Sequence, residues 1–148
     1  MKSEKTIRVG VVGLGQRGSM LIDTVLACAG TEIAAVCDLY EDRVSAAAEK
    51  VRGKQKTPPA QYRDFEDLLA DSRVEVVIVS VSWEEHVRIA CASMQAKKIT
   101  ALEVGGAYCL EDCWKLVHTY ERTKTPFMFL ENCCFDKFEL LGTSLARV

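Results

Sequence analysis

The amino-acid sequence predicts an α/β domain with a doubly wound, mostly parallel sheet. Short apolar runs rich in β-branched residues alternate with segments whose apolar residues recur at helical spacing, and a glycine-rich turn follows the first run. The chain has 148 residues, 49% of them hydrophobic and 27% charged, which suits one domain with a buried core. Its formal net charge of -2 and the absence of a basic stripe argue against a nucleic-acid partner.

The first predicted strand and helix flank the glycine-rich turn. The strand runs from Ile7 to Val12, and apolar residues then recur at helical spacing from Met20 to Cys28, with Gly30 marking the helix end. Between them lie glycines with the spacing G-x-G-x-x-G, at Gly13, Gly15 and Gly18. In dinucleotide-binding folds these glycines permit a tight turn, let the backbone approach the pyrophosphate, and let the helix pack on the strand, in that order. An ordinary flexible loop is the alternative.

The second predicted strand supplies the context that favours the dinucleotide interpretation. It runs from Ile33 to Cys37 and ends in Asp38, twenty positions after Gly18. An acid at this place accepts hydrogen bonds from the ribose hydroxyls of adenosine and repels a 2′-phosphate. The sequence therefore predicts NAD as the cofactor and NADP as the weaker ligand, with Arg43 softening the preference.

The rest of the chain continues the alternation. Helices are expected at residues 44–51, 65–69, 87–94 and 113–120, the last with the apolar residues Cys113, Leu116, Val117 and Tyr120. Strands are expected around Tyr62 and at residues 74–79, 99–104 and 127–130. Right-handed crossovers predict the strand order 3-2-1-4-5-6 of the Rossmann fold. Residues 1–131 form the expected dinucleotide-binding domain, and residues 132–148 form a helix that leads toward an absent substrate domain.

Targeting and cysteine patterns predict a cytoplasmic protein. No apolar run is long enough for a transmembrane helix, and no apolar leader follows "MKSEK". The seven cysteines lie mostly in apolar runs, which is typical of reduced, buried thiols. The pairs "CLEDC" and "CC" lack C-x-x-C spacing, so no metal site is predicted; the alternative is a site formed with His86 or His118.

Five stretches of the sequence resemble the N-terminal domain of the glucose-fructose oxidoreductase and inositol dehydrogenase (Gfo/Idh/MocA) superfamily. They cover nearly the whole chain in the right order: "GVVGLGQRG", "AAVCDLYEDRV", "YRDFEDLLADSRVEVVIVSVSWEEH", "EVGGAYCLEDCWKLV" and "PFMFLENCCF". Within the superfamily, "SWEEH", "EDCW" and "LENCC" look most similar to the NAD-dependent glycosidases. In those enzymes a tightly held NAD transiently oxidises a sugar carbon so that elimination cleaves the glycosidic bond.

The resemblance implies a cofactor lying along the carboxyl ends of the strands. The pyrophosphate would be surrounded by Gly13, Gly15, Gln16, Arg17 and Gly18, with Asp38 on the ribose. Past the fourth strand the cofactor would meet Ser80, Val81, Trp83 and His86. Glu103 would approach the nicotinamide and Asn132 the sugar pocket, which makes His86, Glu103 and Asn132 the catalytic candidates. The structural alternatives are a solvated charge for Arg17, simple packing for Trp83 and a hydrogen-bonded core residue for His86.

The sequence also departs from the family pattern. Oxidoreductases of the superfamily typically carry Glu-Lys-Pro where this chain has Glu103, Val104 and Gly105, so the lysine that assists proton transfer is missing. Glycosidase-like members usually keep the proline that Gly105 replaces. A Thr-Pro expected after Ser80 is Val81-Ser82. Family members also continue for another ~150 to 250 residues, the size of a further domain.

Three functional hypotheses follow from the resemblance and its departures. The main one is the NAD(H)-binding domain of a sugar oxidoreductase-like protein, in which hydride moves to or from a sugar carbon. The others are a non-catalytic dinucleotide-binding or regulatory module and the cofactor half of an NAD-dependent glycosidase. A truncated fragment that persists as a homo-oligomer is a further alternative, and a sugar substrate is expected only with a second domain.

Overall fold

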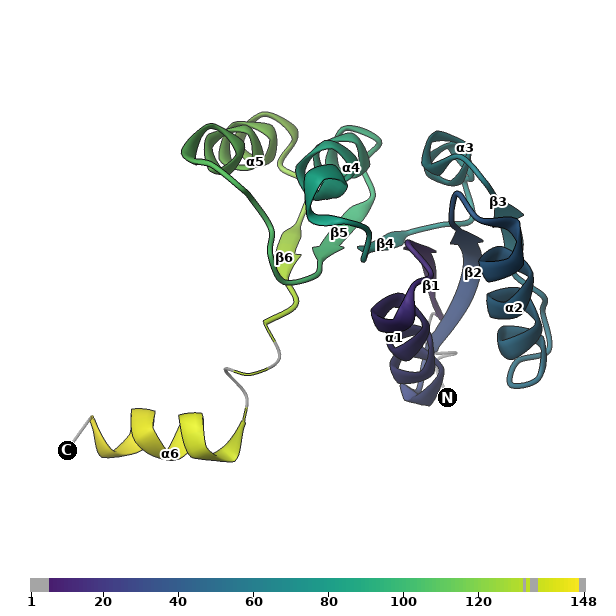
Figure 1. Ribbon diagram of the computed structural model, residues 1–148, viewed down its shortest axis with the longest axis horizontal. Helices are drawn as coiled ribbons and strands as arrows, with labels where there is room; N and C mark the ends of the chain where they lie inside the picture. Colours follow the sequence, from purple (N-terminus) through teal and green to yellow (C-terminus); the bar gives the residue numbers. More distant parts are fainter. Residues whose placement is uncertain (1–5, 132, 134–135, 147–148) are drawn as a thin grey trace.

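Six parallel strands form one sheet with the order β3-β2-β1-β4-β5-β6 in the computed structural model, which describes residues 6–131, 133 and 136–146 (Figure 1). The strands are β1 (Ile7–Val12), β2 (Thr31–Cys37), β3 (Ala60–Tyr62), β4 (Val76–Val79), β5 (Ile99–Leu102) and β6 (Phe127–Phe129). All five pairings are parallel. The predicted strand order is therefore confirmed, and the order reverses between β1 and β4, where such sheets bind their ligands.

Helices cover both faces of this sheet (Figure 1). One face carries α1 (Gln16–Ala27) and α2 (Glu41–Arg52), and the other carries α3 (Phe65–Ala70), α4 (Trp83–Gln95) and α5 (Leu110–Thr123). The last helix, α6 (Lys137–Leu145), buries no residue and lies apart from the sheet. None of the helices in the described part of the chain is long and apolar enough to cross a membrane.

Two apolar clusters, one on each face, hold the layers together. The central strands are buried on both sides, which explains why they read as continuous β-branched runs: Val11, Val77 and Val79 are fully buried. Under α1 and α2 the strands pack on Ile22 and Val51. Burying each such side chain contributes about 1.5–3 kcal/mol, so the sheet is a rigid platform for the loops at its carboxyl edge.

The structure corrects two details of the predicted elements. Strand β5 ends at Leu102, so Glu103 and Val104 belong to the loop at the carboxyl edge. Helix α5 packs over the outer strands at the edge of the sheet and buries only a narrow stripe that includes Leu116. The other apolar residues predicted for this helix, Cys113, Val117 and Tyr120, are therefore exposed.

The prediction of buried thiols is wrong for most of the described cysteines. Cys37 is buried and Cys91 is partly exposed, whereas Cys28, Cys109, Cys113 and Cys133 are exposed. The physical reason is position: Cys28 caps the end of α1 and Cys109 the start of α5, and helix ends lie at the surface. All of these thiols are free, and Cys134 lies outside the described residues.

Candidate cofactor-binding cleft

A cleft of about 600 Å³ opens at the carboxyl edge of the sheet, where the strand order reverses. It is lined by the loops that follow the first five strands, β1 to β5, and by the first turns of α1 and α4. The structure brings together here nearly all the cofactor residues expected from the sequence: Gly13, Gly15, Gln16, Arg17, Asp38, Ser80, Val81, Trp83, His86 and Glu103. Gly18 lies behind the turn, and Asn132 falls outside the described residues.

The structure requires glycine at two of the three positions of the turn, for different steric reasons. Gly13 has a positive φ of 90°, and a Cβ there would collide with the carbonyl oxygen of Ser80. A Cβ at Gly18 would collide with the carbonyl oxygen of Gly13. Gly15 has an ordinary φ of -64°, and a Cβ there would meet nothing within 4 Å. The fold therefore requires Gly13 and Gly18 but gives no reason for Gly15, which faces the cleft.

The N-terminus of α1 is arranged to receive an anion. Its first intrahelical bond runs from Ser19 N to Gly15 O at 2.9 Å, so the N–H groups of the first turn have no carbonyl partner within the helix. No side chain caps this end, and its first turn carries no acidic residue. Every other helix that the structure describes has an acid in its first turn. This end therefore keeps the positive potential that favours phosphate groups.

Asp38 ties the second strand to the glycine turn. One carboxylate oxygen accepts a 2.7 Å hydrogen bond from Leu14 N, and the other accepts a 3.0 Å bond from Tyr40 N. Arg43 Nη1 lies 3.8 Å from the same carboxylate, and its guanidinium stacks on the Tyr40 ring. A carboxylate offers about four acceptor positions, so Asp38 retains capacity for ribose hydroxyls while it holds the loop.

Arg63 is a cleft residue that the sequence analysis missed. It follows β3 directly, and its Nη2 donates to Leu39 O at 2.7 Å. Its Nη1 lies 3.4 Å from Glu41 Oε2. The rule that found Asp38, a polar residue at the carboxyl end of a parallel strand, would have found Arg63 too. The end of the cleft beside β2 and β3 thus carries two arginines and one aspartate.

His86 is a buried residue of α4 with a positioning role. The ring is 1% exposed, and its Nε2 lies 3.1 Å from Val81 O, which can only accept. Burial lowers the pKa of His86, so the ring is neutral at pH 7 and its Nε2–H donates. Its Nδ1 is buried without a hydrogen-bond partner. This geometry fits the structural alternative, in which His86 fixes the loop after β4.

Gly105 and Trp83 pack against each other at the mouth of the cleft. Gly105 has a φ of 95°, and a Cβ there would collide with the Trp83 indole. That indole is 54% exposed and meets the Tyr108 ring edge-on, with centroids 5.9 Å apart. A glycine at position 105 therefore makes room for the tryptophan to lie across the loop after β5.

Glu103 and Arg17 join the two sides of the cleft. Arg17 Nε donates to Glu103 Oε2 at 3.0 Å, between residues 86 positions apart in the sequence. Their side chains are 40% and 12% exposed. Arg17 belongs to α1 and Glu103 follows β5, so the ion pair passes over the end of β4. Arg17 is therefore not merely a solvated charge.

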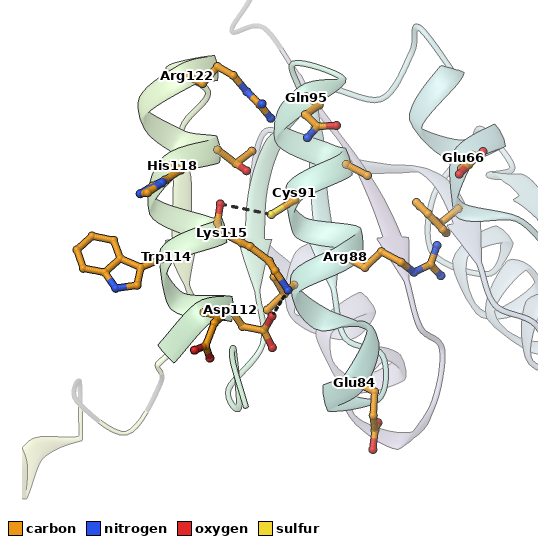
Figure 2. Close-up of a pocket in the computed structure, with 15 residues that line it drawn as sticks. Glu66, Glu84, Arg88, Cys91, Gln95, Asp112, Trp114, Lys115, His118 and Arg122 are labelled. Carbon is orange, nitrogen blue, oxygen red and sulfur yellow. Dashed lines mark hydrogen bonds and ion pairs between the residues drawn. The ribbon is translucent and has the colours of Figure 1, made fainter. Parts of the chain in front are cut away.

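A second cavity, of about 1350 Å³, is lined mainly by α4 and α5 and also by Phe65 and Glu66 of α3 (Figure 2). Its rim has mixed charges, with Lys115 Nζ bonded to Asp112 at 2.7 Å and Cys91 Sγ 3.8 Å from Lys115 O. No residue predicted for the cofactor lines it. In the described part of the chain, no three His, Cys, Asp or Glu side chains are grouped to hold a metal ion.

The parallel sheet, the glycine turn at the helix N-terminus and the aspartate after β2 together define an α/β dinucleotide-binding domain. A match to a known protein family identifies which kind of dinucleotide-binding domain this is. Residues 7–130 match the family described as "Oxidoreductase family, NAD-binding Rossmann fold", Gfo/Idh/MocA. The chain belongs to this family and is its NAD-binding domain.

Curated relatives carry the same domain in longer chains. A glycosyl hydrolase family 109 protein of Solibacter usitatus is 37% identical over 153 residues, covering 99% of this chain and 35% of the relative. A protein of the same description from Streptomyces filamentosus is 40% identical over 146 residues, covering 96% of this chain and 30% of the relative. The chain thus spans about a third of the length of the curated relatives it matches.

Solved structures show the same fold at low sequence identity. The scyllo-inositol dehydrogenase of Lactobacillus casei, solved with NAD(H) and scyllo-inositol, superposes with a TM-score of 0.88 at 16% identity, over 97% of this chain and 41% of that one. The WlbA dehydrogenase of Bordetella pertussis, solved with NADH and UDP-GlcNAcA, gives a TM-score of 0.88 at 17% identity, over 97% of this chain and 42% of that one.

Proposed function

We propose that the cleft residues hold NAD(H) and that the domain serves an enzyme that acts on sugars through hydride transfer. The observation that carries the proposal is Gly15. Neither its backbone conformation nor its surroundings require glycine, yet it stands where the N-terminus of α1 opens into the cleft. A glycine that the fold does not need is accounted for by a ligand that must approach the backbone closely.

Different cleft residues would contact different parts of the extended dinucleotide. Gly13, Gly15, Gln16 and Arg17, with Gly18 behind them, would surround the pyrophosphate, and Asp38 would accept from the ribose hydroxyls. The nicotinamide would meet the residues at the other end of the cleft: Ser80, Val81, Trp83, His86 and Glu103. The bound cofactor would supply a hydride acceptor for a sugar carbon. The protein's own residues bind it, orient it and exclude water at the edge of the sheet.

A glycoside is the favoured substrate class. The relatives at 37% and 40% identity are described as glycosyl hydrolases of family 109. Val104 stands in place of the lysine of the sugar oxidoreductases, which favours the NAD-dependent glycosidase hypothesis over the sugar dehydrogenase hypothesis. The substrate contacts and acid-base groups would come from the additional length that the relatives have.

The test is the substitution Gly15→Val. We expect NAD⁺ affinity to fall by at least about 100-fold, about 2.8 kcal/mol, because the side chain fills the space of the pyrophosphate. The fold should persist with a loss of only about 1 kcal/mol at the helix cap. Calorimetric titration measures binding, and circular dichroism with thermal melting measures the fold.

Gly53→Val is the matched control for this experiment. Gly53 also lies at a helix end, has an ordinary φ of -69° and has no neighbour that would come closer than 3.6 Å to a Cβ. It is not among the residues that line the cleft. This variant should bind NAD⁺ normally. A folded Gly15→Val protein that binds like the control would contradict the proposal.

Self-association, cytoplasmic location and the domain boundary at residue 131 also remain proposals. Apolar residues on α6 are exposed, with Phe138 at 71% and Leu145 at 68%, which supports a homo-oligomer formed through this helix. The free thiols of the described cysteines support a reducing compartment. The lack of any buried residue on α6 supports assigning residues 132–148 to a segment outside the NAD-binding domain.

A further inference from the structure

The Arg17–Glu103 ion pair lies where the two halves of the cleft meet. Asp38 follows β2, so the adenosine belongs to the half built on β1, β2 and β3, and the nicotinamide to the half built on β4, β5 and β6. Glu103 follows β5 and therefore belongs to the nicotinamide half. Arg17 is in the first turn of α1, at the phosphate-binding end. The pair thus connects the phosphate position with the nicotinamide position.

Glu103 depends on a nearby cation because it is poorly solvated. The residue is 9% exposed, and its Oε2 accepts from Arg17 Nε at 3.0 Å. The neighbouring His86 ring is held neutral by burial, so it adds no positive charge beside Glu103. A carboxylate this deeply buried is stabilised mainly by the positive charges around it.

Binding of a dinucleotide gives the Arg17 guanidinium a second anionic partner besides Glu103. The pyrophosphate brings negative charge to the start of α1, where it attracts the guanidinium. As Arg17 turns toward the phosphates, the Glu103 carboxylate loses part of the positive charge that neutralises it. The nicotinamide ring is positively charged in NAD⁺ and neutral in NADH, so only the oxidised form replaces that lost positive charge.

We propose that the negative charge of Glu103 makes the cleft bind NAD⁺ more tightly than NADH, and that Arg17 partly neutralises this charge. This inference rests on the proposed cofactor role of the cleft. Glu103 then has an electrostatic function that needs no proton transfer. Arg17 limits the preference for NAD⁺, because its guanidinium interacts with both the Glu103 carboxylate and the phosphates. A protein built this way keeps its cofactor ready to accept hydride.

The experiment compares the dissociation constants of NAD⁺ and NADH for the wild-type chain and for Glu103→Gln. We expect the ratio of the NADH constant to the NAD⁺ constant to fall by at least about fivefold, the lower end of typical coupling between charged sites. Arg17→Gln should shift the ratio the other way, even though both forms bind more weakly without the phosphate contact. The measured quantity is the ratio of the two dissociation constants, so a loss of affinity that is equal for NAD⁺ and NADH does not change it.

Glu75→Gln is the matched control. Glu75 Oε2 pairs with Arg8 Nε at 3.3 Å and its side chain is 24% exposed, but it lies outside the cleft. Its substitution removes the same charge and should leave the ratio unchanged. Equal changes in NAD⁺ and NADH binding for Glu103→Gln or Arg17→Gln would overturn the inference alone. A wild-type chain that binds neither form would overturn the proposed function as well.

Discussion

Asp38 illustrates how one residue can hold the fold at the same place where we propose that it meets a ligand. Its carboxylate holds Leu14 N and Tyr40 N, which fixes the glycine turn beside the end of β2. The same group is 8% exposed and faces the cleft. Its proposed role in cofactor choice is therefore coupled to its role in loop structure. The effect of substituting Asp38 must be assessed from the relative affinities for two cofactors rather than from one absolute affinity.

At this position we predict that NAD⁺ binds more tightly than NADP⁺, because the Asp38 carboxylate repels a 2′-phosphate. We expect Arg43 and Arg63, which line the same cleft, to offset part of that repulsion. Arg43→Gln should therefore raise the preference for NAD⁺ by about fivefold or more, and Asp38→Asn should lower it. Calorimetric titration with both cofactors measures the change. Equal or tighter NADP⁺ binding by the wild-type chain would refute the assignment of Asp38.

At the scale of elements, the first turn of α4 is anchored from inside by His86. The Nε2–H bond to Val81 O holds the loop after β4 against the helix. Because burial lowers the pKa of His86 from its ordinary value of 6.5, the unfolded chain binds this proton more readily than the folded chain does. Electrostatic attraction from Glu103 and Glu84 opposes the shift without reversing it.

We therefore predict that stability falls as the pH drops below 6.5, toward the lowered pKa of His86, and that this contribution is constant above 6.5. The slope from this one group is at most about 1.4 kcal/mol per pH unit. In His86→Gln the amide still donates to Val81 O but does not titrate, so the slope between pH 7.5 and 5 should be smaller. Denaturant unfolding at several pH values measures it.

His118→Gln is the control for this pH dependence. His118 is the second of the two histidines in the chain and lies exposed on α5, so its substitution should leave the slope as in the wild type. If His86→Gln and the wild type lose stability in parallel from pH 7.5 to 5, the neutral, buried state of His86 is wrong.

At the scale of the whole molecule, the two faces of the sheet are covered unequally (Figure 1). Helices α1 and α2 cover the β1–β2–β3 half of one face, while β5 and β6 expose Ile99 at 45% and Met128 at 57%. Helix α6 extends away and exposes Phe138, Leu141 and Leu145 along one side. Exposed apolar surface of this kind is typical of interaction sites and of aggregation-prone surfaces.

We predict that the 148-residue chain self-associates through α6. Leu141→Asp should shift the population toward monomer by roughly tenfold or more in dissociation constant, since a buried carboxylate at an apolar interface costs at least about 1.4 kcal/mol. Met20→Asp, which replaces an equally exposed apolar residue on α1, is the control and should not change the mass. Light scattering after size exclusion provides the measurement, and a wild-type monomer at every concentration would refute it.

The architecture and most of the cleft residues could be predicted from local patterns in the amino-acid sequence. Buried parallel strands leave continuous β-branched runs such as Ile7–Val12, and right-handed crossovers then fix the strand order. The glycine spacing and Asp38 mark the carboxyl edge because each follows a strand directly along the chain. These are local signals, since they depend on residues a few positions apart.

The contacts between residues far apart in the chain could be seen only in the folded structure. The bond from Leu14 N to Asp38 and the pair between Arg17 and Glu103 join segments 24 and 86 positions apart, and they depend on how the strands lie beside one another in the sheet. The exposure of Val117 follows from the place of α5 at the sheet edge. Periodicity gives the face of a helix that is apolar, but whether a neighbour covers that face is set by elements far away in the sequence.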